Sequence, residues 1–370
     1  MSLRTLAPAV LLAAALAAAQ RPVFPGKEWT EAAPESQGVD AAKLKAAVAH
    51  MEANFGPDGA RELVVVRNGY LIHKGPAADT YHNVWSCTKT FTSTALGLLV
   101  ADGKCAIDDP AVTYVPDLDD RYPAYGKIRL RHLASMSAGY KGEVAGVSKD
   151  QPWGEPPYYL NPVAPLFEAG TKVQYNDHEV FLLGKILTRL AGESLRTLFR
   201  RRIAAPLGMD PWDWGASGTV DGIELSNAAG TPNHPGVQTT ARQMARFGLL
   251  YLNRGNWNGR QLLPASFVDE AVRNQVGGAG QSSFLCQRYG FYWWTNGMMP
   301  GGKRPWPDAP PLSYTSHGHR SNFWVVIPEW NMVVVRMGTA SICPGPTSQT
   351  DVAWNGFFAK LREAIQDGAR

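Results

Sequence analysis

Ser86 and Lys89 have the residue types and the spacing that suit catalysis best in this sequence. They are the first and last residues of Ser86-Cys87-Thr88-Lys89, the only Ser-x-x-Lys motif in the 370 residues. An apolar stretch follows at which a helix should begin, and three residues along a helix bring Lys89 back to the face of Ser86. Serine is a weak nucleophile until a base takes its proton, and a buried lysine with a lowered pKa can be that base. The motif predicts a serine nucleophile; an N-capping serine beside an unrelated exposed lysine is the alternative.

Other known catalytic signatures do not occur. The sequence contains no Gly-x-Ser-x-Gly, P-loop or Gly-x-Gly-x-x-Gly motif. His178-Glu179 begins like a zinc-protease helix, but Leu182 occupies the place of the second histidine. His317 and His319 alternate on an expected strand and could both contact zinc, so a zinc hydrolase is the least favoured alternative. We expect no metal and no cofactor.

Strand patterns lie near both ends of the chain and helical patterns lie between them. Two β-rich runs flank Asn68-Gly69, a strong hairpin signal. The expected strands are 63–67, 70–74, 322–327 and 332–336. The expected helices are 90–101, 180–190, 195–203, 241–252 and 350–366. This order predicts an α/β (α+β) composite in which N- and C-terminal segments form an antiparallel sheet flanked by helices, with an inserted, mostly helical subdomain.

We therefore expect one domain over residues 20–370. Its α/β part covers about 30–90 and 285–370, and its helical insertion covers about 91–284. Ligand pockets commonly form at such junctions, so the site should lie between the two parts. Trp85, Tyr159 and the proline-rich loop 300–311 are candidates for its walls, and loop 141–165 is long enough to shape it.

Composition excludes several classes of protein. With 45% hydrophobic and 18% charged residues, the chain should fold around a sizeable core. Residues 1–19 read as a charged start, an Ala/Leu run and a small-residue cleavage site, which predicts export to the periplasm or medium. No later run is long enough to span a membrane. The net charge is +4, and the only Lys/Arg block, at 200–202, is typical of a solvated helix face, so we expect no nucleic-acid partner.

The four cysteines do not form a disulfide framework. None belongs to a Cys-x-x-Cys pair, and an exported protein can still form one or two bridges. The sequence leaves all three full pairings open for Cys87, Cys105, Cys286 and Cys343.

The sequence around Ser86 resembles that of a known family. Segments 85–104, 108–116, 128–139, 169–187, 203–209 and 239–250 are similar, in order, to class C β-lactamase-like serine hydrolases. This family also holds penicillin-binding D-aminopeptidases, 6-aminohexanoate-dimer hydrolases and family VIII esterases. The resemblance covers about residues 62–336, and several ordered matches make it specific although each motif is short.

The family's second motif is Tyr-x-Asn. The similar segment 169–187 places the tyrosine of this motif at Tyr175. The resemblance implies that Tyr175 shares the proton relay with Lys89. The third position is Asp177 instead of asparagine. An amide can donate to a substrate carbonyl, whereas a carboxylate only accepts. Asp177 near Lys89 should also raise the pKa of the lysine and weaken it as a base, so proton abstraction should fall more on Tyr175 or on Asp177 itself.

The third motif, Lys-Thr-Gly or His-x-Gly, should lie on an inner strand near residue 317. We prefer the register His317-Gly318-His319, in which the backbone N–H of Arg320 is the second oxyanion donor besides that of Ser86. The alternative, Ser316-His317-Gly318, restores the final glycine, loses the basic first residue and gives the donor role to His319.

These motifs predict an exported serine hydrolase that forms an acyl-enzyme on small molecules or short peptides. Because His317 is mostly neutral near pH 7 and Asp177 replaces an amide, we expect esterase or amidase activity on neutral or cationic substrates, with weak or no β-lactam turnover. A binding or sensor module that retains the fold without turnover is the alternative from another class. The sequence names no partner protein.

Overall fold

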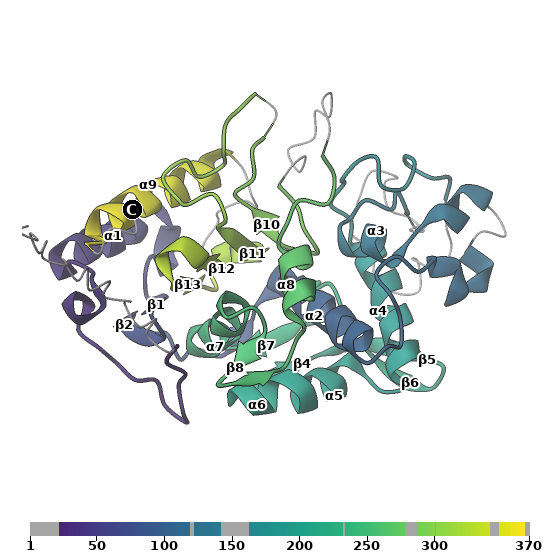
Figure 1. Ribbon diagram of the computed structural model, residues 1–370, viewed down its shortest axis with the longest axis horizontal. Coiled ribbons are helices and arrows are strands. Elements are labelled where there is room, and N and C mark those ends of the chain that lie inside the picture. The colour runs from purple at the N-terminus through teal and green to yellow at the C-terminus, as the bar shows by residue number, and fades with distance from the viewer. Residues whose placement is uncertain are drawn as a thin grey trace, which may run out of the picture.

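The computed structural model describes residues 22–118, 122–141, 163–231, 234–277, 288–299, 301–340 and 348–366. Its centre is a six-stranded antiparallel sheet in the order β10-β11-β12-β13-β1-β2 (Figure 1). The strands are β1 (Glu62–Arg67), β2 (Tyr70–Lys74), β10 (Trp294–Thr295), β11 (Tyr314–Gly318), β12 (Asn322–Ile327) and β13 (Met332–Met337). Both ends of the chain contribute strands to this one sheet, which confirms the predicted architecture.

Both faces of the sheet are buried. Alternate residues of the strands point to opposite faces. On β13, Val333 and Val335 belong to one hydrophobic core and Met332 and Val334 to the other. The first face packs against α7 (Ala241–Leu252), and the second is covered by α1 and α9. A sheet covered on both sides explains why its strands read as continuous apolar runs.

The chain termini close the second face together. Helix α1 (Ala41–Asn54) packs along α9 (Ser348–Ala364), and Figure 1 shows the two side by side. Asp40 caps α1 by accepting a hydrogen bond from the Lys43 N–H at 3.0 Å. The closing helix predicted at 350–366 is confirmed with a shift of two residues.

The β1–β2 hairpin has the predicted turn. Asn68 and Gly69 both have positive φ, at 53° and 85°. Two such residues in a row are typical of the type I′ turn that suits the twist of paired strands. The Asn-Gly signal therefore located the hairpin correctly.

The middle of the chain is mostly helical. Its remaining helices are α2 (Thr88–Ala101), α3 (Leu130–Ala134), α4 (Asp177–Ala191), α5 (Leu195–Phe199), α6 (Ala205–Leu207) and α8 (Ala265–Ala271). Its short strands are β3 (His82–Asn83), β4 (Trp212–Trp214), β5 (Ala216–Val220), β6 (Ile223–Ser226), β7 (Val237–Thr239), β8 (Asn256–Trp257) and β9 (Arg260–Gln261). A π-helical turn at Arg200–Ala204 joins α5 to α6. The domain boundaries given above stay a prediction.

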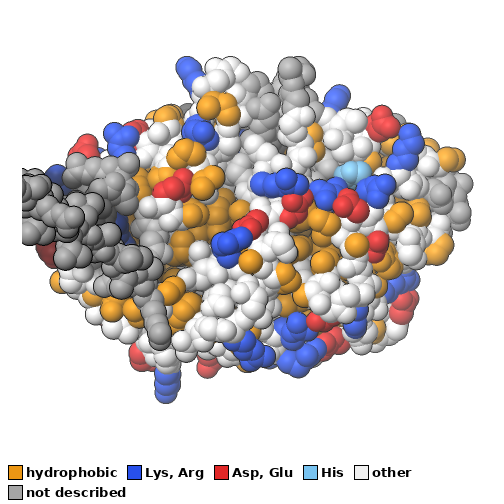
Figure 2. Space-filling model, in the orientation of Figure 1, with side chains coloured by type: hydrophobic (Ala, Val, Ile, Leu, Met, Phe, Trp, Pro, Cys, Tyr) orange, Lys and Arg blue, Asp and Glu red, His pale blue; other side chains and the backbone are white. Residues whose placement is uncertain are grey.

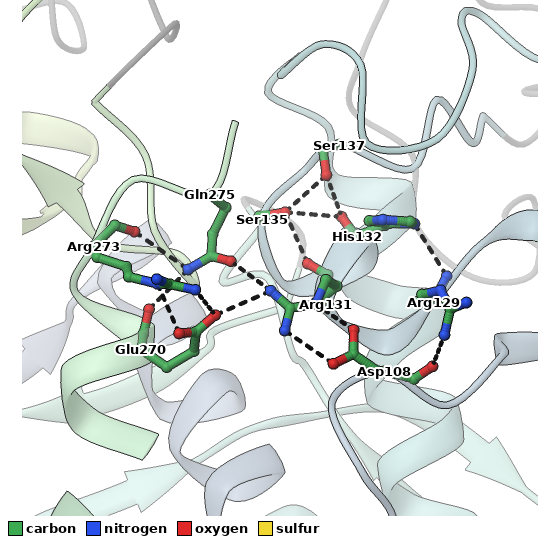
Figure 3. Close-up of polar contacts among 9 residues, drawn as sticks. All are labelled: Asp108, Arg129, Arg131, His132, Ser135, Ser137, Glu270, Arg273 and Gln275. Carbon is green, nitrogen blue, oxygen red and sulfur yellow. Dashed lines mark hydrogen bonds and ion pairs between the residues drawn. The ribbon is translucent and has the colours of Figure 1, made fainter. Parts of the chain in front are cut away.

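A polar network connects α3 to α8 within this helical part (Figure 3). The Arg131 guanidinium donates to Asp108 at 2.5 and 3.1 Å and to Glu270 at 3.0 Å. Gln275 accepts from the same guanidinium at 3.1 Å, and Arg273 binds Glu270 from the other side. One arginine thus joins three segments of the chain.

Charged side chains of both signs are mixed on the surface (Figure 2). In the only Lys/Arg block, Arg200 pairs with Asp213 at 3.1 Å and Arg202 pairs with Asp102 at 2.9 Å. Arg201 pairs with Glu193 at 2.5 Å. Ion pairs within the chain therefore engage all three arginines of the block, which agrees with a solvated helix face.

Among the described residues, no helix has the length and apolar character needed to cross a membrane. Cys87 and Cys105 are buried free thiols. Some residues named in the sequence analysis lie outside the described residues: the proposed leader 1–19, Tyr159, Cys286, Cys343 and most of loop 141–165.

Candidate active site

Ser86 lies in a short 3-10 turn, Trp85–Cys87, that leads directly into α2. Trp85 has a φ of +53°, which is rare for a bulky residue, and its N–H binds the Asn83 side chain at 3.0 Å. Gly230 packs on the other side, where a Cβ would lie 2.1 Å from the Trp85 carbonyl oxygen. Strained backbone of this kind is concentrated at functional sites. The turn holds the half-buried Ser86 at the N-terminus of a buried helix.

Lys89 is surrounded by oxygen acceptors. Its side chain is buried, and its Nζ donates to Ser86 Oγ at 2.8 Å and to the Ala229 carbonyl at 2.7 Å. Asp177 Oδ1 lies 2.9 Å from the same nitrogen. An ammonium has three N–H groups, whereas a neutral amine has two. The arrangement therefore fits a protonated lysine.

Electrostatics favour the same state. Burial by itself lowers the pKa of Lys89, but the Asp177 carboxylate and the Tyr175 side chain outweigh it, and the net shift is upward. The direction that the sequence predicted for this pKa is confirmed. At neutral pH Lys89 is a donor to Ser86 and not a ready base.

Tyr175 lies just before α4, above Lys89. Its ring stacks on Trp294 at 6.1 Å, and Lys89 Nζ lies 5.1 Å from the ring centre. Its hydroxyl forms hydrogen bonds with Lys89 and Ser86. Burial raises the pKa of Tyr175 above its ordinary value against the opposing charge of Lys89, so the hydroxyl is a neutral phenol near pH 7. Ser86, Lys89 and Tyr175 meet as predicted.

Asp177 begins α4 with a buried carboxylate. The preceding Asn176 caps the helix by accepting from the His178 N–H at 2.8 Å. Because Asp177 is paired with Lys89, its negative charge is neutralised inside the protein. It is therefore placed to act on the lysine, and a contact between Asp177 and substrate stays a prediction.

The third motif differs from the sequence prediction. Strand β11 ends at Gly318, and His319 lies in the following turn, His319–Ser321. The two histidines therefore do not alternate along one strand, as we had expected. A Cβ at Gly318 would lie 2.3 Å from the Val84 carbonyl and 3.3 Å from the Cys87 N. Only glycine fits this approach to the nucleophile turn, so the geometry favours the register Ser316-His317-Gly318.

This register changes the expected oxyanion donor. Counting from Gly318, the N–H that follows the glycine belongs to His319 and not to Arg320. Arg320 has a φ of +62°, and its carbonyl is bound by the buried Arg336 at 3.1 Å. The geometry thus favours the alternative register, which gives the donor role to His319, and the oxyanion role itself stays a prediction.

The side chains of the motif have distinct surroundings. The His317 ring stacks on Phe323 at 4.1 Å, and burial, with the charges of Arg288 and His319, lowers its pKa to about 3. His317 is therefore neutral at physiological pH. The exposed His319 contacts Trp85 at 5.0 Å, and the Arg320 guanidinium lies 5.8 Å from the same Trp85 ring. Trp85 thus lies between Ser86 and the turn after β11, and its role as a wall of the site stays a prediction.

Sequence reasoning missed the turn that supplies the Ala229 carbonyl. Asn227 is buried, and its Oδ1 accepts from the N–H groups of Ala229 at 3.2 Å and Gly230 at 2.9 Å. Its Nδ2 donates to Thr231 and to the His234 carbonyl. Asn and Gly are typical turn residues, which was a usable signal, but nothing in the sequence connected this turn to Lys89.

The described residues contain no cluster of three or more His, Cys, Asp or Glu side chains arranged to hold a metal ion. The described chain thus offers no cluster on which to build the zinc alternative.

Comparison with known proteins identifies a family for most of the chain. The family model described as "Beta-lactamase" matches residues 48–342. The beta-lactamase of Pseudomonas fluorescens is 28% identical over 131 residues, a match that covers 35% of this chain and 36% of that protein. The match thus spans about a third of that relative.

Solved structures share the fold. A penicillin-binding protein homologue from Caulobacter crescentus superposes with a TM-score of 0.63 at 17% identity, over 88% of this chain and 99% of that one. A beta-lactamase/D-alanine carboxypeptidase from Yersinia pestis gives 0.62 at 21% identity, over 87% and 99%. With the family model matched across most of the sequence, the chain belongs to the beta-lactamase family of serine hydrolases.

Proposed function

We propose that this protein is an exported serine hydrolase that cleaves ester or amide bonds through an acyl-enzyme at Ser86. The observation that carries the proposal is the 2.8 Å contact between Lys89 Nζ and Ser86 Oγ at the start of a buried helix. A serine hydroxyl within hydrogen-bond distance of a lysine and a tyrosine is an arrangement that can support nucleophilic catalysis. Export rests on the pattern of residues 1–19.

In the proposed reaction, Ser86 Oγ attacks the substrate carbonyl. Its proton passes through Tyr175 or a transiently neutral Lys89 to the leaving oxygen or nitrogen. The N–H groups of Ser86 and His319 stabilise the oxyanion. Water then attacks the acyl-enzyme, the acyl group leaves as the carboxylic acid with the water's hydroxyl, and the other proton of that water restores the Ser86 hydroxyl.

The charges around the site support uncharged substrates. Asp177 is paired with Lys89 at 2.9 Å, so the reason to expect cationic substrates is removed. His317 is neutral, and Ser316 occupies the place of the basic residue in the favoured register. Neither position offers a cation to a substrate carboxylate. We therefore propose esterase or amidase activity on neutral substrates, with weak or no turnover of β-lactams.

The test combines labelling and turnover. A fluorophosphonate probe should label Ser86, as mapped by peptide mass spectrometry, and Ser86→Ala should lower kcat for p-nitrophenyl butyrate at least about 1,000-fold. Ser36→Ala, an exposed serine outside the site, is the matched control and should keep full activity. Unchanged ester hydrolysis in Ser86→Ala would refute the mechanism. Hydrolysis of nitrocefin with a higher kcat/KM than the ester would refute the proposed substrate class.

The engaged Lys89 also favours a second candidate, a binding module of the same fold with impaired catalysis. Its ammonium is surrounded by acceptors and is poorly suited to take a proton. This candidate predicts either no labelling of Ser86 or labelling without turnover of any ester, amide or β-lactam.

A further inference from the structure

Glu179 is a buried carboxylate that the proposed reaction does not use. It lies on α4 with 1% of its surface exposed, and no Lys, Arg or His of the described chain forms an ion pair with it. A carboxylate removed from water without a cation is costly and needs compensating hydrogen bonds. Burial accordingly raises its pKa well above the ordinary value, against three backbone N–H groups that lower it.

Those N–H groups belong to one short segment. Glu179 Oε2 accepts from Ala138 at 3.1 Å, and Oε1 accepts from Tyr140 at 3.3 Å. The N–H of Gly139 lies between them and also favours the charged carboxylate. Glu179 thus binds one edge of the segment 136–140 from helix α4.

The same segment holds the residues on either side of Tyr175. The Gln174 N–H donates to the Met136 carbonyl at 2.9 Å. The Asn176 side-chain amide donates to the Tyr140 carbonyl. The segment 136–140 therefore forms a support to which residues 174 and 176, on either side of Tyr175, are both bonded.

A third set of contacts fixes this support from outside. The Leu166 N–H donates to the Gly139 carbonyl at 3.0 Å, and a Cβ at Gly139 would lie 2.3 Å from the Phe167 carbonyl. The support is thus enclosed between residues 166–167 and α4, and Glu179 is the side chain that binds it to α4.

We propose that Glu179 is a positioning residue for the proposed hydrolysis. Its carboxylate fixes the segment 136–140 and, through Asn176, holds Tyr175 and Asp177 against Lys89. Glu179 touches neither Ser86 nor Lys89 in any described contact, so it acts through this segment. The inference rests on the proposed function and adds a residue to it.

The substitution Glu179→Gln tests the inference with little change of shape. An amide accepts through one atom only, and its NH₂ group would face a backbone N–H. We expect kcat for p-nitrophenyl butyrate to fall at least tenfold while KM stays within twofold. A loosened Asp177 also acts less on Lys89, so the acidic limb of the pH profile should move to lower pH, which is also the direction that we expect for Asp177→Asn.

The controls separate positioning from folding and from the proposed function itself. Glu168→Gln removes an exposed carboxylate paired with Lys127 at 3.2 Å and should leave kcat and the pH limb unchanged. If Glu179→Gln does not fold, Asn176→Ser supplies the same readout, because serine caps α4 equally well but cannot bind the Tyr140 carbonyl. A folded variant with wild-type kcat and an unmoved limb would overturn the inference, and a lower kcat with an unmoved limb would do so too. Ester hydrolysis that survives Ser86→Ala would instead overturn the proposed function.

Discussion

Lys89 contacts three oxygens, and one of them belongs to a carboxylate where the family motif has an amide. At the scale of single residues, this carboxylate is the neighbouring group that most affects the charge of Lys89. A carboxylate stabilises the ammonium form of a neighbouring amine and so weakens it as a base. Ser86, Lys89 and Tyr175 lie together, and the protonation state of the lysine depends on Asp177.

The first prediction concerns the Asp177→Asn variant. Removing the carboxylate leaves burial as the main influence on Lys89, which lowers its pKa, so the neutral amine forms at lower pH. The acidic limb of kcat/KM for a neutral ester should move down by at least about one pH unit. Asp221→Asn, which changes an exposed aspartate paired with Arg189, is the control and should leave the limb in place. A limb that stays put or moves up in Asp177→Asn would contradict this account.

At the scale of elements, His82 connects the strand before the nucleophile turn to the central sheet. On β3, its Nε2 lies 2.8 Å from Glu62 at the start of β1, and its Nδ1 lies 3.0 Å from the Asn83 carbonyl. Burial by itself lowers the pKa of His82, but Glu62, the Asn83 carbonyl and the charge of Asp58 together raise it above 6.5. The contact is therefore strongest when the histidine is charged.

The second prediction follows from the sign of this shift. A folded-state pKa above the unfolded one contributes stability that is fully present below the unfolded pKa of about 6.5 and is lost as pH rises through the folded pKa. The difference in unfolding free energy between wild type and His82→Gln should be larger at pH 5.5 than at pH 8.5. Urea unfolding at both pH values measures it. An equal difference at the two values would show that the His82–Glu62 contact does not titrate as proposed.

At the scale of the whole molecule, the central sheet depends on both chain ends. Strand β1 pairs with β13, which follows more than two hundred residues later, and α1 packs on α9 to cover the shared face. Trp354 of α9 lies at the centre of that layer, against Phe55 at 5.2 Å and Phe323 at 4.8 Å. Because β11 belongs to the same sheet, this packing also holds the Gly318 turn beside Ser86.

The third prediction compares two residues of α9. Trp354 is 1% exposed, whereas Val352 is 71% exposed. Trp354→Ala should lower the free energy of unfolding by about 3–5 kcal/mol, the usual cost of removing a buried aromatic side chain. Val352→Ala should change it by less than about 0.5 kcal/mol. Denaturant unfolding measures both, and a small effect of Trp354→Ala would mean that α9 adds little to the stability of the sheet.

The sequence by itself determined the long strands near both ends of the chain and several of the helices, but not α1, α3, α6, α8 or the short strands. Helix α7 has the predicted bounds, and the hairpin at Asn68-Gly69 was located by its turn residues. These features depend on local periodicity and turn chemistry, which a sequence displays directly. Ser86, Lys89 and Tyr175 were identified from motifs whose spacing or context is local.

Only the tertiary structure decided the register of the third motif and the state of the lysine. The register depends on the close approach of Gly318 to Val84, which are separated by more than two hundred residues. The acceptor set of Lys89 likewise joins α2, α4 and the turn at Ala229. Distances between segments far apart in the chain are set by packing, and a carboxylate acts on a buried amine only at such distances, so neither result can be read from spacing along the sequence.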